Sequence, residues 1–148
     1  MAAPTYTWEF VYDLWGDRVP KIITMEATTS LETKVGTMLF VTSGQLDNCT
    51  DGTGTMLGLA AEATSAAATA ADPIKVALIA PGMVIRGTAT ADASSLTGFA
   101  SRIQDIDSTQ ALDVTDQTGG FLSVYRVNDD DGLEVDCIVT NFDMGQAV

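Results

Sequence analysis

Few side chains in this sequence could carry out chemistry. It contains no histidine, the residue that most often acts as a general base at neutral pH and as a zinc ligand. Its absence removes Ser-His-Asp and Cys-His arrangements together with His-ligated zinc. A lysine could still activate a serine, but Lys21, Lys34 and Lys75 lie in ordinary strand or turn contexts without a nucleophile motif. We therefore expect that the protein is not an enzyme and uses no cofactor.

The two cysteines, Cys49 and Cys137, are too few and too far apart for a structural zinc site. Cys137 lies in the segment LEVDCIV, in phase with Leu133, Val135 and Val139, so we expect a buried thiol. Cys49 lies in the loop segment DNCTDG, and a protein made in a reducing cytoplasm has no need of a disulfide. The sequence therefore predicts two free cysteines and no metal site.

Charge limits the classes of partner. Acidic residues number 20 against seven basic ones, and the net charge is −13. Nucleic acids and anionic membrane surfaces repel such a protein, so we expect neither as a partner. No apolar run approaches the roughly 20 residues of a membrane span, and the first residues, MAAPTYTWEF, lack the pattern of a signal peptide.

The elements that would position any site are short strands. Apolar runs of strand length occur between turn-forming clusters, which is typical of an antiparallel barrel or sandwich. These runs cover residues 21–27, 37–42, 55–63, 74–80, 83–89, 121–127 and 133–142. The last two should form a hairpin closed by NDDDG at 128–132. One domain, mainly β, is expected from the length of 148 residues.

Two stretches do not fit the strand pattern. In residues 93–106, Leu96, Phe99, Ile103 and Ile106 follow helical spacing, so one short helix is expected there. The Ala-rich stretch 60–72 could be a short helix by propensity or a surface loop, since it lacks large apolar residues.

The N-terminal segment TYTWEFVYDLW is unusually aromatic. Tyr6, Trp8, Phe10 and Tyr12 occupy alternate positions and Trp15 follows, so an extended backbone would put four rings on one face. Burying these rings alone could not order a free arm, because fixing its backbone costs more free energy than the buried area returns. The segment is therefore either an arm that adds a strand to a partner or the first strand of the domain's own core.

Several segments in order resemble a known family. The run GTMLGLAAEATSAAATAADPIKVALIAPGMVIRG, the upstream KVGTMLFVTSGQLDN and the downstream ALDVTDQTGGFLSVYRVNDDDGLEVDCIV are similar to decoration, or cement, proteins of tailed-bacteriophage capsids. The likeness covers roughly residues 30–140, and residues 90–110 do not align with it. The resemblance implies a lambda-like β-tulip domain that forms homotrimers on the outside of a phage capsid.

This resemblance also implies a structural role in the virion. The protein would be made in the host cytoplasm and would stabilise the capsid by bridging subunits of the major capsid protein. Residues 1–20 would form an N-terminal arm that binds the capsid through Tyr6, Trp8, Phe10, Tyr12 and Trp15, and residues 21–148 would form the decoration domain. Ile138 shares a strand face with Glu134 and Asp136 and is a candidate for the subunit interface. Another virion module, of the tail, baseplate or fibre, and a carbohydrate-binding β-sandwich are the alternatives.

Overall fold

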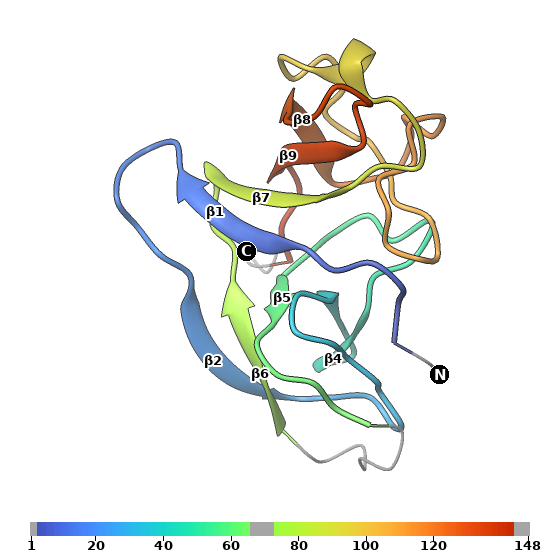
Figure 1. Ribbon diagram of the computed structural model, residues 1–148. Coiled ribbons are helices and arrows are strands. Elements are labelled where there is room, and N and C mark those ends of the chain that lie inside the picture. The colour runs from blue at the N-terminus through green and yellow to red at the C-terminus, as the bar shows by residue number, and fades with distance from the viewer. Residues whose placement is uncertain (1–2, 66–72, 144–148) are drawn as a thin grey trace.

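In the computed structural model, which describes residues 3–65 and 73–143, the chain forms two antiparallel β-sheets (Figure 1). The first sheet, of order β1-β7-β9-β8, consists of β1 (Glu9–Asp13), β7 (Met83–Thr88), β8 (Leu122–Val127) and β9 (Glu134–Val139). The second, of order β2-β6-β5-β3-β4, consists of β2 (Lys21–Glu26), β3 (Met38–Thr42), β4 (Gln45–Asn48), β5 (Gly58–Ala60) and β6 (Pro73–Leu78). The expected mainly β class is confirmed. No helix in these residues is long and apolar enough to cross a membrane.

A bent two-stranded ribbon joins the two sheets. β1 and β2 follow each other along the chain and pair with β7 and β6, which are also consecutive. The pairing runs from Glu9 opposite Arg86 in the first sheet to Glu26 opposite Pro73 in the second. Between the paired parts, residues 14–20 lie opposite the shorter connection 79–82, because both segments cross from one sheet to the other there (Figure 1). The two strands of the ribbon are therefore not paired as a ladder at this crossing, which we call the open crossing.

The apolar side chains pack in two clusters. The larger takes residues from both sheets and from the segments that precede or connect their strands, among them Trp8, Met38, Met56, Ile85, Phe121 and Cys137. The smaller lies within the second sheet and includes Leu39, Leu46, Leu57 and Val76. The second sheet thus contributes side chains to both clusters, and the two clusters meet near the crossing of the ribbon.

The second sheet curls until its edges meet at one point. Ala27, just after β2, forms a parallel bridge with Leu46 of β4, and the N–H of Thr28 donates to the carbonyl of Leu46 at 2.9 Å. The first sheet keeps its own strand order. The described chain therefore pairs as two sheets, and this one bridge draws the edges of the second sheet together.

The prediction of one short helix within residues 93–106 is wrong. Ser94–Leu96 form a single 3-10 turn, and the described part of the chain has no α-helix. Gly98 and Phe99 adopt φ values of +71° and +61°, which a right-handed helix cannot contain. Their N–H groups instead donate to main-chain carbonyls of β8, so this segment covers the edge of the first sheet.

Most expected strands are confirmed, and one strand, β4, lies outside the predicted apolar runs. β4 lies in the segment QLDN, which had the composition of a turn. It pairs with β3 across the two-residue turn Ser43-Gly44. Both turn residues have positive φ, 50° and 78°, as the tightest hairpins require. The Ala-rich stretch 60–72 lies largely outside the described residues.

The closing hairpin forms as predicted. β8 and β9 pair on either side of residues 128–132. Cys137, Val135 and Val139 are buried in the larger core, which confirms the buried thiol, but Leu133 is 37% exposed and lies outside that stripe. Cys49 is also buried, and both cysteines are free. Burial raises the pKa of both thiols, which keeps them in the unreactive protonated form.

Candidate functional site

The aromatic N-terminal segment belongs to the domain's own fold, which differs from the expected arm at residues 1–20. Trp8 is 2% exposed and lies in the larger core. Its Nε1 donates a 2.7 Å hydrogen bond to the carbonyl of Gln110. The indole packs so closely on Gly87 that a Cβ there would lie 2.2 Å from the ring. Phe10 is half-buried against the same core. Burial of these rings against this chain's own loops holds the segment in place.

The four alternating rings do not share one face. Phe10 pairs with Ile85 and Tyr12 with Val84, and the register shifts between these two pairs. Ile85 and Val84 are successive residues of β7 and therefore lie on opposite faces of the sheet. The bulge thus turns Tyr12 to the outer face while Phe10 faces the core, so the single aromatic face predicted by strict alternation is wrong.

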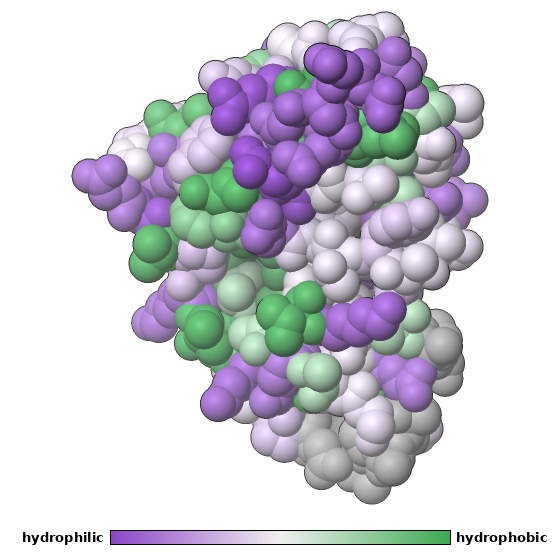
Figure 2. All heavy atoms as spheres, viewed as in Figure 1, coloured by the Kyte–Doolittle hydropathy of each residue, from purple (hydrophilic) through white to green (hydrophobic). Residues whose placement is uncertain are grey.

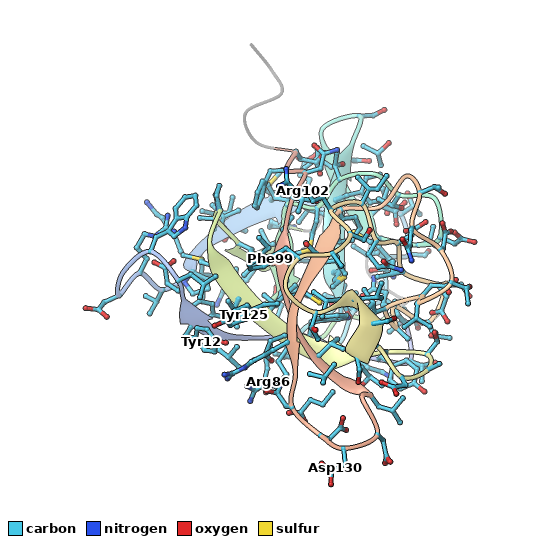
Figure 3. The ribbon with its side chains drawn as sticks, turned by 90° about the horizontal axis from the view of Figure 1, so that it is seen from above. Tyr12, Arg86, Phe99, Arg102, Tyr125 and Asp130 are labelled. Carbon is cyan, nitrogen blue, oxygen red and sulfur yellow. The ribbon has the colours of Figure 1, made fainter. Side chains whose placement is uncertain are left out.

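Tyr12 joins a network centred on Asp136, which is fully buried on the outer face of the first sheet. Arg86 donates to Asp136 at 2.7 and 3.1 Å, Arg126 at 3.1 Å, Asn128 at 2.8 Å and Tyr12 at 3.3 Å. Burial alone would raise the pKa of the Asp136 carboxyl, but the hydrogen bonds from Arg86, Asn128 and Arg126 outweigh it and lower the pKa. Figure 3 shows Tyr12 and Arg86 extending from neighbouring strands. The network therefore ties four strands together.

Trp15 is the most exposed of the five aromatic residues predicted to bind a partner. It lies in the crossing segment 14–20 and is 71% exposed. One face of its ring packs on Gly82, where a Cβ would lie 2.7 Å from the indole. Gly82 has a φ of +85°, a conformation that glycine adopts without steric cost. The N–H of Leu14 donates to the carbonyl of Gly82 at 2.8 Å. The ring is thus held by backbone and remains open to solvent.

An ion pair holds the same segment. The guanidinium of Arg18 bonds both carboxylate oxygens of Asp13, at 2.7 and 3.0 Å, and it donates to the carbonyl of Pro81 at 2.6 Å. Its carbon lies 5.7 Å from the centre of the Trp15 ring, within the range of a cation–π contact. The hydrogen bond from Arg18 lowers the pKa of Asp13 to about 2. The arrangement presents Trp15 and Arg18 in one preset geometry.

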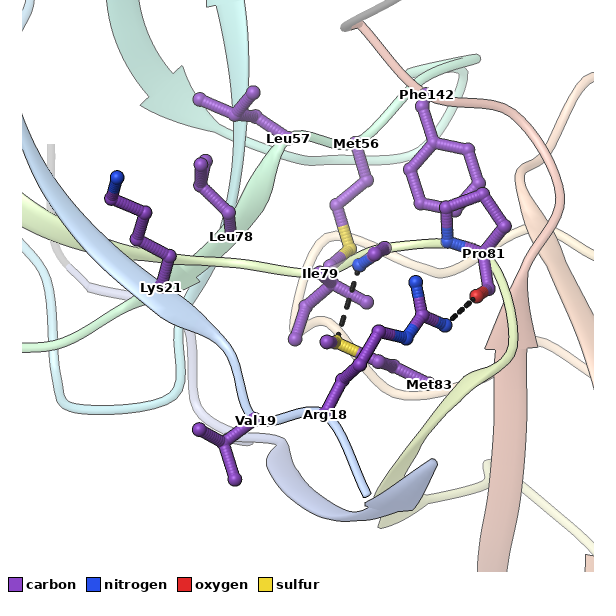
Figure 4. A pocket seen from close by; sticks show the side chains of 11 residues that line it. Arg18, Val19, Lys21, Met56, Leu57, Leu78, Ile79, Pro81, Met83 and Phe142 are labelled. Atoms are coloured by element: carbon purple, nitrogen blue, oxygen red, sulfur yellow. Dashed lines mark hydrogen bonds between the residues drawn. The ribbon is translucent and has the colours of Figure 1, made fainter. Parts of the chain in front are cut away.

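An apolar groove lies beside this segment, where the two cores meet at the open crossing. It has a volume of about 630 Å³. Its walls are formed chiefly by Met56, Leu57, Leu78, Ile79, Met83 and Phe142, and Arg18, Val19 and Lys21 lie at its rim (Figure 4). Leu14, Val19 and Ile22 are exposed nearby, at 40%, 73% and 57%. Figure 2 shows apolar residues along the side of the molecule where β1 passes into β2. We call residues 14–22 the crossing surface.

Two other predicted site residues lie elsewhere. Tyr6 is 39% exposed, and its N–H donates to the carbonyl of Thr109 at 3.0 Å. Ile138 lies on the outer face of the first sheet, where it pairs with Val84 and Ser123, and it is half-buried. The structure does not bring either residue to the crossing surface. Of the five aromatic residues predicted to bind a partner, Trp15 alone lies on it.

Three carboxylates lie close together in loops away from the crossing surface. Oxygens of Asp51, Asp105 and Asp116 lie within 4.8 Å of one another, close enough to hold a cation. Asp105 is buried and accepts hydrogen bonds from the N–H groups of Gly52 and Ile106. Burial raises the pKa of its carboxyl despite these bonds. Through these two main-chain hydrogen bonds, Asp105 holds the loop of Gly52 against the segment that contains Ile106.

Sequence reasoning missed Arg18 and the groove. Arg18 looked like one of seven scattered basic residues, and the only local signal was Asp13 five positions before it. The groove is built from residues of four separate segments, 18–21, 56–57, 78–83 and 142. No periodicity joins such segments, so only the fold could reveal the groove.

Comparison with known proteins gives no family for this chain. No protein-family model matches the sequence, and no curated protein matches it.

Proposed function

We propose that this protein is a structural component of a phage virion that binds the outside of the capsid and stabilises it by bridging subunits of the major capsid protein. The family assignment depends on the segments that resemble capsid decoration proteins, and with it we propose a β-tulip fold, a homotrimer, and no enzymatic activity or cofactor. The observation that carries the proposal is the preset, exposed pair of Trp15 and Arg18.

Tryptophan and arginine, with tyrosine, are the residues enriched among binding hot spots. A rigid side chain loses little conformational entropy on binding, so a preset ring favours affinity. Trp15 is held by Gly82 and Arg18 before any partner arrives. This arrangement supports a protein-binding role, and it moves the proposed contact from an arm to the crossing surface.

The test uses empty capsids assembled from the major capsid protein encoded in the same genome. Wild-type protein should co-sediment with them, and Trp15→Ala should bind 30- to 1,000-fold more weakly, since a hot-spot residue contributes about 2–4 kcal/mol. Ile103→Ala is the matched control, because Ile103 is also exposed, at 50%, and lies beside β8 at the opposite edge of the first sheet. Absence of co-sedimentation by wild-type protein, or binding to a glycan array in its place, would overturn the proposal.

The homotrimer has its own test. Ile138 is half-buried on the outer sheet face, and we propose that it contributes to the interface between subunits. Light scattering of wild-type protein, free and released from capsids, should give the mass of three chains, and Ile138→Asp should shift it to one. A monomer mass for wild-type protein in both conditions would contradict this part of the proposal.

A further inference from the structure

The apolar groove has the composition of a small-molecule site. Its volume of about 630 Å³ falls within the roughly 300–1,000 Å³ of ligand pockets, which are mostly apolar with a few polar groups. Met56, Ile79, Met83 and Phe142 come from the larger core, and Leu57 and Leu78 from the smaller one. The groove is therefore a gap between two cores, with apolar walls on both sides, and an apolar chain could fill it.

The charged groups at the groove are all cationic. Of the chain's 20 acidic and seven basic residues, the described residues that line the groove include no acid and two bases, Arg18 and Lys21. Asp13 balances the charge of Arg18. No carboxylate in the described part of the chain forms an ion pair with Lys21. One ammonium at the rim is thus uncompensated, in a protein that is otherwise strongly acidic.

We propose that this groove binds a small amphipathic anion, with its apolar chain between the two cores and its carboxylate at Lys21. Figure 4 shows Lys21 beside Leu78 at one end of the groove and Arg18 across its mouth, bonded to Pro81. A carboxylate at the rim would gain the attraction of Lys21 without leaving water, so the head group needs no burial. A fatty-acid-like carboxylate is the class of ligand that fits this combination. Capsid binding plays no part in this inference.

The probe is dodecanoate, titrated below its micelle threshold into the full-length protein by calorimetry. Saturable binding of one molecule per chain is expected. Decanoate should bind about 15-fold more weakly, because each buried methylene contributes roughly a fourfold change in affinity. Dodecyltrimethylammonium, which has the same chain and the opposite charge, should bind more weakly than dodecanoate.

Two variants locate the site. Lys21→Glu should weaken dodecanoate binding about three- to tenfold, as expected for reversing a charge at an exposed rim. Its matched control is Lys75→Glu, which makes the same charge change further along the same β2–β6 pair, opposite Thr24, and should leave the affinity unchanged. Ala80→Phe places a ring at the groove and should abolish binding, while a circular dichroism melt verifies its fold.

Absence of saturable dodecanoate binding would overturn the proposal. Equal affinity for the cationic amphiphile, or equal effects of Lys21→Glu and Lys75→Glu, would overturn the assignment of an anion at Lys21. Because Lys21 is exposed, its substitution tests the site even where Ala80→Phe fails to fold.

Discussion

The two tryptophans of this protein lie seven positions apart in one segment, and each packs on a glycine of the opposite strand or turn. Trp8 lies on Gly87 and Trp15 on Gly82. Yet Trp8 is 2% exposed and Trp15 is 71% exposed. The difference in exposure comes from segments outside the two-stranded ribbon that carries both tryptophans. The loop that carries Gln110 covers Trp8 and accepts its Nε1–H, whereas Trp15 lies at the open crossing, where Arg18 is its other partner.

The comparison separates two uses of the same side chain. A covered indole with its N–H bonded contributes to the stability of the fold, and an uncovered indole held from below offers surface to a partner. Changes near Trp8 should therefore act mainly on unfolding, and changes near Trp15 should act mainly on binding.

The largest effect is expected from Trp8→Ala. Removing a buried tryptophan costs about 3–5 kcal/mol, a large part of the stability of a typical domain, whereas Trp15→Ala should change it by less than 1 kcal/mol. Urea unfolding followed by circular dichroism measures both. For the same reason, deletion of residues 1–15 should unfold the protein, since it removes the whole of β1 together with Trp8. A truncated chain that melts like wild type would restore the arm interpretation.

The glycines beneath the two rings give a second contrast. Gly87→Ala should cost about 3 kcal/mol, because the new Cβ meets a ring that the core prevents from moving. Gly82→Ala should cost about 1 kcal/mol, from placing a Cβ at positive φ, and the exposed ring of Trp15 can move aside. In protein labelled with 5-fluorotryptophan, Gly82→Ala should shift the ¹⁹F resonance of Trp15 and not that of Trp8. Equal costs would contradict the contrast.

A smaller effect concerns the ion pair that holds Trp15. The pKa of Asp13 is about 2 in the folded protein against an ordinary value of 3.8. A lowered folded pKa means that the stabilisation is fully present above about pH 4 and declines as the pH falls toward 2. Wild-type protein should therefore lose more stability over this interval than Asp13→Asn, with the difference between them constant above it. Parallel pH curves of the urea midpoint would contradict the role of Asp13.

Reducing agent should have no effect on the stability of the protein. Cys49 and Cys137 are buried and free, so dithiothreitol should not shift the melting temperature. Native protein should also react with a thiol reagent only as fast as the core opens, and Trp8→Ala should accelerate that reaction while Trp15→Ala should not. A lower melting temperature in reductant would indicate a disulfide and a different topology.

Much of the fold could be predicted from the sequence because the information is local. The alternation around Cys137 and the turn chemistry of residues 128–132 predicted β9 and its hairpin correctly. The prediction of a helix at 93–106 failed because N–H groups of this segment bond to carbonyls of β8, and because Ile103, which the helical spacing included, is exposed. β4 lay outside the predicted apolar runs because its residues, QLDN, have the composition of a turn.

The candidate site could be predicted only in part. The sequence indicated that Trp15 was available to a partner, but it grouped this residue with three rings that pack within the fold and with Tyr6, which lies away from the crossing surface. One bulge in β1 reversed the face of Tyr12, and a register shift of this kind leaves no mark in an alternating pattern.

By itself, the sequence determined the β class, the negative charge, the lack of histidine and the spacing of the strands, because these depend on residue type and on neighbours along the chain. The tertiary structure decided which tryptophan is covered, that Arg18 meets Pro81, and that two cores leave a groove between them. Those outcomes depend on segments separated by tens of residues, such as Trp8 and Gln110. Only the packing of the whole chain sets the distances between such segments.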